Sequence, residues 1–455
     1  MNKMSSRLFA ALCLLFCILP LYADSAVSLT YGESGNYMLV EKTDLRRYDN
    51  GKYTGLMSRE VQSFIAEEKR EGNTRYYDGN FFVVIETKHN RRVVMDGVRT
   101  AIDSSFKITG SGELVMIEDN GYPSFRSFPS YPEKKINIGD SWQAQGERAV
   151  DPLNDGTVTR MPILVEYTYV RDDVYNGRDV YVLSAKWATR YGLSFVDSEG
   201  DPNLSSASGK HDALIIISKE GGHALVIKDT VDETFVYADG HQVELKGNIA
   251  LFTKYPPSYN TNAVRSAAER QKIASADKPN SRTETGNGAG GTTGAGNGTS
   301  GKKKSDTGTG KTGKGNTGSA QTPGKSTPEP IDADTTVEDS EKGVKLVMRN
   351  LLFKPDSAEL LSGENERLDS IAQVLKSAPE AQYLVEGHTA DTGNPSGEQQ
   401  LSEQRAKAIA EALAARGIPA SQFICKGCGS RKPVASNLTR AGMAQNRRVE
   451  ITILK

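Results

Sequence analysis

A long glycine-rich stretch without aromatic residues divides the chain, and it constrains the possible folds more than any other feature. Between Gly286 and Gly324, 14 of 39 positions are glycine, and Thr, Ser, Asn and Lys fill most of the rest. No Phe, Tyr or Trp occurs from Asn260 to Leu352. Such a segment cannot bury enough apolar surface to offset the entropy of ordering it. We therefore expect a flexible Gly/Thr/Ser/Lys-rich linker over residues 257–338, with a folded part on either side.

The first residues have the pattern of an export signal. A positively charged start precedes an almost unbroken apolar run from Leu8 to Leu21, and Ala23 offers a small residue for cleavage. The run is shorter than the roughly 20 residues that a membrane-spanning helix needs. We expect residues 1–23 to be a signal peptide and the mature protein to be exported to the periplasm or the outer membrane.

The four cysteines exclude a disulfide scaffold in a chain of 455 residues. Cys13 and Cys17 lie in the apolar run, where a lipoprotein signal is the alternative, but a bulky residue precedes each of them. Cys425 and Cys428 form a C-x-x-C pair in a segment that reads as a strand entering a turn. The pair is interpreted as two incidental thiols or one local bridge, because no second ligand pair completes a metal site.

Charge excludes another class of partner. The chain has 56 basic and 57 acidic residues, which give a net charge of −1, so a whole-chain polycation is ruled out. One stretch, Lys426 to Arg448, carries six basic residues and no acid. No aromatic residue interleaves it, and the protein is expected to be exported. We expect no nucleic-acid partner, and interpret the stretch as a solvated basic face.

Residues 24–256 have the pattern of an antiparallel β domain, either a sandwich or a barrel-like sheet. Alternating apolar runs flank Asn176-Gly177, Gly221-Gly222 and Asp239-Gly240, pairs that suit tight hairpin turns because they accept positive φ. A turn is also expected at Asp78-Gly79, before a strand. One amphipathic helix is predicted at Ser58–Lys69.

No catalytic or metal-binding motif occurs in this β domain. Its histidines, His89, His211, His223 and His241, are scattered, and no nucleophile elbow, phosphate loop or H-E-x-x-H pattern is present. We expect no enzymatic activity, no cofactor and no metal.

The last 115 residues or so alternate between strand and helix patterns. Strands are expected at Gly343–Met348, Gln382–Gly387, Phe423–Cys425 and Val449–Leu454, and helices from Gly363 to Ser377 and from a cap at Ser402 to Gly417. The order βαβαββ predicts a compact α/β sandwich with both helices on one face.

Several spaced motifs in this region resemble one family. They are Leu352-Phe353 with Ser357-Ala358, then Gly387-His388-Thr389, then Leu401-Ser402 with Arg405-Ala406, and finally Asn446-Arg447-Arg448. Residues 339–455 therefore resemble the OmpA C-terminal domain family, the peptidoglycan-associating module of envelope proteins. The resemblance implies an OmpA-like fold and non-covalent binding of the peptidoglycan stem peptide at its diamino acid.

The resemblance also implies a set of binding residues. Arg405 matches the family arginine, which would bind the carboxylate of the diamino acid. Thr389 matches a polar position of the binding loop, and Asn446 and Arg447 match the closing motif. The family acid normally follows Gly-x-Thr directly, but Ala390 stands there. Asp391 or Glu398 is expected to bind the ammonium instead, unless the ligand differs or the site has been lost.

Two functions follow as alternatives. The first is a non-enzymatic cell-envelope protein whose C-terminal domain, with a divergent binding loop, tethers an outer-membrane or periplasmic β module to peptidoglycan. Its partners would be the stem peptide and also the outer membrane or its proteins. The second is a periplasmic ligand-binding β protein whose OmpA-like domain has lost ordinary peptidoglycan binding and serves protein contacts. The first requires a carboxylate near Arg405, whereas the second predicts a large apolar pocket in residues 24–255.

Overall fold

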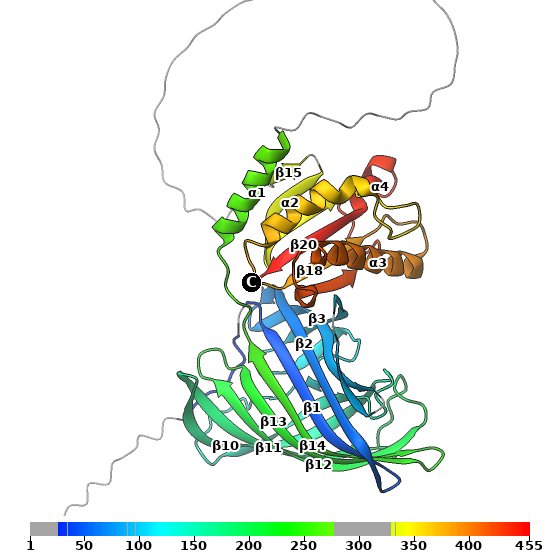
Figure 1. The fold of residues 1–455 in the computed structure, drawn as a ribbon. Helices are drawn as coiled ribbons and strands as arrows, with labels where there is room; N and C mark the ends of the chain where they lie inside the picture. The colour runs from blue at the N-terminus through cyan, green and yellow to red at the C-terminus, as the bar shows by residue number, and fades with distance from the viewer. Residues whose placement is uncertain (1–25, 34, 89, 96, 277–328, 333) are drawn as a thin grey trace, which may run out of the picture.

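The computed structural model describes residues 26–276 and 329–455, except residues 34, 89, 96 and 333. Figure 1 shows two folded parts, an N-terminal sheet coloured blue to green and a C-terminal α/β part coloured yellow to red. We call residues 26–254 the β domain, and residues 329–455 together with helix α1 (Thr261–Ala276) the C-terminal domain. The signal peptide expected at residues 1–23 lies outside the described residues. Within the described part of the chain, no helix is long and apolar enough to cross a membrane.

The β domain is one large antiparallel sheet that curves into a barrel-like shape (Figure 1). Among the described residues it contains 13 strands, in the order β7-β6-β3-β2-β1-β14-β13-β12-β11-β10-β9-β8, with β4 paired to β3. The strands are β1 (Met38–Asp49), β2 (Lys52–Glu71), β3 (Thr74–Lys88), β4 (Arg91–Val94), β6 (Ile102–Ile108), β7 (Leu114–Glu118), β8 (Phe125–Arg126), β9 (Ser141–Val150), β10 (Thr159–Tyr175), β11 (Arg178–Tyr191), β12 (Leu204–Ser218), β13 (Ala224–Tyr237) and β14 (Gln242–Lys254).

The hairpin turns predicted from dipeptides are confirmed. Asn176 and Gly177 both have positive φ, 49° and 77°, and they join β10 to β11 with Tyr175 opposite Arg178. Gly222 and Gly240 also have positive φ, 63° and 85°, in the connections between β12, β13 and β14. The turn chemistry was therefore readable locally, because only a few residue types accept this backbone conformation.

Two local predictions in the β domain were wrong. Residues Ser58–Lys69 form no helix but lie within strand β2, and Asp78-Gly79 lies inside β3 rather than in a turn. The segment of β2 has buried residues on both of its faces, with Ile65 in the barrel core and Phe64 against the C-terminal domain. Burial on two faces produces a run of apolar residues whose spacing imitates a helix. Gly79 is required for close packing, since a Cβ there would lie 2.6 Å from the ring of Phe81.

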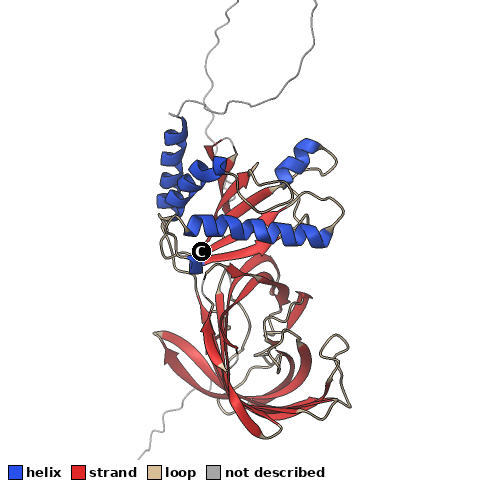
Figure 2. Cartoon of the chain, turned by 45° about the vertical axis from the view of Figure 1, so that its right-hand side comes forward, coloured by secondary structure: helices blue, strands red, loops and turns tan. Residues whose placement is uncertain are grey.

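The C-terminal domain has the predicted order of strands and helices, except that a short helix, α4, lies between its last two strands, and further strands extend the sheet at both edges. Its core elements are β17 (Gly343–Arg349), the 3₁₀ turn η1 (Ser362–Glu364), α2 (Asn365–Leu375), β18 (Tyr383–His388), α3 (Pro395–Ala414), the 3₁₀ turn η2 (Ala420–Gln422), β19 (Phe423–Gly427), α4 (Arg440–Asn446) and β20 (Arg448–Leu454). The additions are β5 (Arg99–Thr100), β15 (Glu329–Asp332) and β16 (Thr335–Ser340), which extend the sheet to the order β15-β16-β17-β20-β18-β19-β5. Figure 2 shows the helices of the molecule gathered in this domain.

The linker predicted at residues 257–338 is wrong at both of its ends. Helix α1 begins at Thr261, and its Val264, Ala267 and Ala268 are buried in the same core as Leu368 of α2. At the other end, β16 pairs with β17 from Thr335 to Ser340. The small apolar residues of α1 pack because α2 covers them, and β16 forms because β17 offers a sheet edge. Composition alone therefore did not reveal either element. The middle of the predicted linker, residues 277–328, lies outside the described residues.

Candidate functional site

Arg405 lies on helix α3, and its side chain is held in place by the opening loop of the domain. The helix is capped by Asn394, whose side chain accepts a hydrogen bond of 3.1 Å from the Gly397 amide, not by Ser402 as predicted. The Nε of Arg405 donates to the Ser357 carbonyl at 3.1 Å, and its guanidinium lies 4.9 Å from the centre of the Phe353 ring. These contacts orient a half-buried guanidinium and leave its terminal nitrogens available.

The charged residues that act on Arg405 are Arg447 and Asp356, whereas the sequence suggested Asp391 or Glu398. Burial lowers the pKa of Arg405, the positive charge of Arg447 lowers it further, and the carboxylate of Asp356 acts in the opposite direction. An arginine nonetheless stays protonated. Among the described residues, no carboxylate lies within ion-pair distance of Arg405. The Arg405 guanidinium is therefore available to bind an anionic group of a ligand.

Thr389 directly follows β18, and its hydroxyl is buried without a partner. The side chain is part of a residue that is only 6 % exposed, and Oγ1 has no hydrogen-bond partner within the described structure. Its amide donates to the Gly429 carbonyl at 2.9 Å, which fixes the backbone of the loop. Ala390, in the position of the family acid, is buried as well. A buried hydroxyl without a partner is costly, so a ligand atom that satisfies it would be favoured.

Asp391 is exposed, and its side chain turns back onto its own loop. Its Oδ1 accepts a hydrogen bond of 3.0 Å from the Gly393 amide, and its own amide donates to Oδ1 of Asn437 at 3.3 Å. No contact joins Asp391 to Arg405 in the part of the chain that the structure describes.

Glu398 is buried and organises the loop from inside. Its Oε1 accepts hydrogen bonds from the Thr392 amide at 2.6 Å, the Thr392 hydroxyl at 2.8 Å and the Asn394 amide at 3.3 Å. Its Oε2 accepts one from the Ser430 hydroxyl at 2.6 Å. The bond from Ser430, together with those from Thr392 and Asn394, lowers the pKa of Glu398 to about 2. The carboxylate is thus ionised at neutral pH, but the hydrogen bonds of the loop already occupy its oxygens.

Asn446 and Arg447 have different environments. The Oδ1 of Asn446 accepts from the Val434 and Ala435 amides at 2.8 and 2.9 Å, and its Nδ2 donates to the Ala435 carbonyl at 2.8 Å. Asn446 therefore fastens a loop. Arg447 is exposed and adds positive charge near Arg405.

Asp356 is an acidic residue near Arg405 that the sequence motifs did not single out. It is exposed, lies in the left-handed region with φ of 49°, and belongs to the same short loop as Ser357, whose carbonyl holds Arg405. The signal was present, because Asp356 stands between the motif residues Phe353 and Ser357.

Two other predictions about this region can be compared with the structure. The stretch from Lys426 to Arg448 is not a uniformly solvated basic face, because both of these residues are buried in ion pairs. Cys425 and Cys428 are buried and not bridged. Burial raises the pKa of Cys428 to about 12 and that of Cys425 further still, which makes both thiols unreactive.

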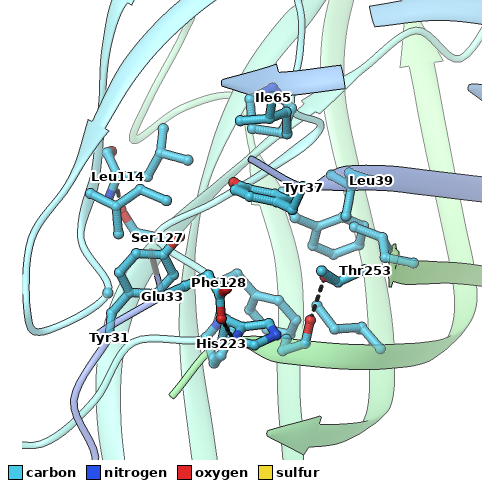
Figure 3. A pocket seen from close by; sticks show the side chains of 18 of the residues that line it. Tyr31, Glu33, Tyr37, Leu39, Ile65, Leu114, Ser127, Phe128, His223 and Thr253 are labelled. Carbon is cyan, nitrogen blue, oxygen red and sulfur yellow. Dashed lines mark hydrogen bonds and ion pairs between the residues drawn. The ribbon is translucent and has the colours of Figure 1, made fainter. Parts of the chain in front are cut away.

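The β domain contains an apolar cavity, which bears on the second function. Figure 3 shows its wall, with Tyr31, Tyr37 and Phe128 facing the space and Glu33 and His223 at one side. His223 pairs with Glu33 through Nδ1, and its Nε2 lies 2.7 Å from the Tyr255 hydroxyl. The cavity measures about 100 Å³, well below the roughly 300–1,000 Å³ of typical ligand pockets. It is too small to be the large apolar pocket that the ligand-binding alternative predicts. A hollow of about 560 Å³ in the same domain is larger, but charged residues such as Glu166, Lys186 and Asp232 line much of it.

Comparison with known proteins places the C-terminal region in a family. Residues 352–447 match the OmpA family. The peptidoglycan-binding protein ArfA of Mycobacterium tuberculosis is 41 % identical over 103 residues, which are 23 % of this chain and 32 % of ArfA. The outer-membrane lipoprotein YfiB of Pseudomonas aeruginosa is 37 % identical over 103 residues, 23 % of this chain and 61 % of YfiB. This chain thus matches about a third of ArfA and about three fifths of YfiB.

Two solved structures are also similar to the C-terminal region in sequence. An outer membrane protein from Borrelia burgdorferi is 36 % identical, with a TM-score of 0.24, and the match covers 27 % of this chain and 100 % of that one. The peptidoglycan-associated lipoprotein from Burkholderia pseudomallei is 33 % identical, with a TM-score of 0.22, over 23 % of this chain and 88 % of that one.

Proposed function

We propose that this chain, which carries an OmpA family domain in its C-terminal region, is a non-enzymatic protein of the cell envelope that attaches its β domain to peptidoglycan. The observation that carries the proposal is Arg405, a half-buried guanidinium oriented by Ser357 and Phe353 without a carboxylate partner among the described residues. The peptidoglycan-binding relative ArfA supports it. Export to the periplasm or the outer membrane belongs to the same proposal.

The proposed ligand is the diamino acid of the stem peptide, whose side chain ends in an ammonium and a carboxylate. Arg405 would bind the carboxylate through its terminal nitrogens, since a planar guanidinium matches a carboxylate in a bidentate pair. Arg447 would add attraction from the rim. The buried Thr389 hydroxyl would donate to a ligand oxygen. No bond is made or broken, and binding needs no cofactor.

We propose Asp356 as the residue that binds the ammonium. Ala390 offers no charge, Asp391 is turned onto Gly393, and the oxygens of Glu398 are occupied by Thr392, Asn394 and Ser430. Asp356 is exposed and its charge already acts on Arg405. The carboxylate and the guanidinium would then flank the two ends of the diamino acid.

The test is sedimentation of the mature chain, residues 24–455, with purified sacculi that contain meso-diaminopimelate. Removing one partner of a desolvated charge pair costs about 2–5 kcal/mol. Arg405 is only half-buried, so we expect Arg405→Ala to weaken binding at the lower end, roughly 30-fold. Arg440→Ala, which removes an exposed arginine of the same domain, is the matched control. Equal binding by wild type, Arg405→Ala and Arg440→Ala would contradict the proposed site.

The same assay separates this function from its alternative. Asp356→Asn, Asp391→Asn and Glu398→Gln identify the acid, and sacculi with lysine in place of meso-diaminopimelate test the need for the ligand carboxylate. If the wild-type chain sediments with neither kind of sacculus, the OmpA family domain no longer binds the wall, and the function lies in protein contacts or in the β domain.

A further inference from the structure

The face of the C-terminal sheet that points away from helices α2 and α3 is covered by the β domain. Side chains alternate along each strand, so Val385 of β18 faces the helices while Leu384 faces the other way. Leu384, Ile424 and Leu454 are at most 1 % exposed, and they share a core with Met38, Phe64 and Phe82 of the β domain. An apolar core that contains residues of both domains is typical of a permanent interface.

The β domain also contributes one strand to the C-terminal sheet. Strand β5, which lies between β4 and β6 of the β domain in sequence, pairs in parallel with β19, with Arg99 opposite Ile424. The Ala101 amide extends this pairing by donating to the Cys425 carbonyl at 2.8 Å. The β domain thereby covers a sheet edge that would otherwise expose unpaired backbone groups.

Buried charges of opposite sign face each other across the same interface. Lys426 lies 3.2 Å from Asp103 and 3.4 Å from Asp78, and Lys342 lies 2.6 Å from Asp78. The four side chains are between 6 % and 16 % exposed. Burial alone would raise the pKa of Asp78, but the charges of Lys426 and Lys342 outweigh it and hold the pKa below its ordinary value. Since an unpaired buried charge is strongly unfavourable, these pairs tie each domain to the other.

A further set of contacts lies at the end of the same sheet. The Nδ2 of Asn36 in the β domain donates to the carbonyls of Glu341 and Lys455, at 2.9 and 3.0 Å. Helix α1, which follows the β domain in sequence, is buried against α2. Apolar packing, strand pairing, ion pairs and backbone contacts all place the domains in one arrangement.

We infer that the β domain is a built-in partner for the open sheet face of the OmpA family domain, so that the two form one block held together non-covalently. This differs from two modules joined only by residues 257–338. Arg405 belongs to helix α3 and Asp356 to the opening loop of the same domain. The contacts that orient Arg405 all come from this domain. Docking of the β domain therefore leaves the proposed wall-binding site accessible, and the inference holds whether or not that site binds peptidoglycan.

The test is to cut the chain between the domains after it has folded. A specific protease site is inserted between Pro257 and Ser258, which are exposed and separate β14 from α1. The purified protein is cleaved, and the products are run on a gel-filtration column at low micromolar concentration in physiological salt. We expect both fragments to elute together as one species of the uncut size. Separation of the wild-type fragments into two peaks would overturn the inference.

One variant and one control sharpen the result. Phe64→Glu places a charge in the shared core, and Leu214→Glu makes the same kind of change at an outward, partly exposed position of β12 in the same domain. We expect cleaved Phe64→Glu to dissociate at concentrations at least tenfold higher than wild type, and cleaved Leu214→Glu to behave as wild type. Unchanged association of Phe64→Glu would contradict the shared core. If Phe64→Glu does not fold, cleavage of the wild type decides alone.

Discussion

Glu398 offers a sharp test of the site, because the structure gives it a role in the loop and the sequence had suggested a role in the ligand. Its carboxylate accepts four hydrogen bonds, two from backbone amides and two from hydroxyls. A hydrogen bond to a charged group contributes about 1.5–3 kcal/mol, against about 0.5–1.5 for a neutral pair. Glu398→Gln keeps the shape and removes the charge, so it loses about 1 kcal/mol on each of the two shortest bonds. We expect a loss of about 2 kcal/mol in the free energy of unfolding at pH 7.

The pH dependence of this loss has a definite sign. Hydrogen bonding holds the pKa of Glu398 at about 2 in the folded protein, whereas an unfolded glutamate titrates near about 4.3. A depressed pKa contributes stability that is fully present above the unfolded value and is lost as the pH falls through the folded value. The difference between wild type and Glu398→Gln is therefore expected to shrink between about pH 5 and pH 2.

The assay is urea unfolding followed by circular dichroism at pH 7 and at pH 3, with sacculus binding measured in parallel. Glu403→Gln is the control, since it removes a carboxylate of the same helix that only pairs with Lys407 near the surface, a contact that contributes about 0.3–0.5 kcal/mol. Two results would refute the reasoning. One is an equal loss of stability at both pH values, and the other is loss of wall binding by Glu398→Gln without any loss of stability.

Three further predictions follow from the structure. Asp356→Asn is expected to weaken sacculus binding about two- to fivefold, because an exposed carboxylate contributes up to about 1 kcal/mol; binding equal to wild type would exclude Asp356 as the ammonium partner. Cys425 and Cys428 are expected to react with a thiol reagent at pH 8 only after unfolding, since burial raises both pKa values; rapid labelling of the native protein would contradict this. Val264→Asp in α1, at a fully buried position, is expected to lower the stability of the C-terminal domain by at least about 2 kcal/mol through an unpaired buried charge. The control Arg270→Ala, at an exposed position of the same helix, is expected to change that stability by less than about 0.5 kcal/mol. A loss of stability no greater for Val264→Asp than for Arg270→Ala would place α1 outside the core.

The candidate site was only partly readable from the sequence. Arg405 and Thr389 are candidates because their motifs have a fixed spacing. In the described structure, Arg405 has available terminal nitrogens and Thr389 has a hydroxyl without a partner. The acid could not be chosen in the same way. Asp391, Glu398 and Asp356 all carry the right charge, but which of them is occupied by the loop depends on distances to Gly393, Thr392 and Ser430. Spacing along a chain does not contain those distances.

Local chemistry determined the hairpins and the alternation of strands and helices. Residues such as Asn176 and Gly177 accept the positive φ that a tight turn needs, and the apolar positions of α2 and β18 repeat within one element. Contacts between distant segments decided the rest. The sequence of Ser58–Lys69 became a strand, α1 joined a core, and Asp78 and Lys426 became partners only once two sheets lay face to face. The physical reason is that the burial of a side chain depends on what covers it, and here each domain is covered by the other.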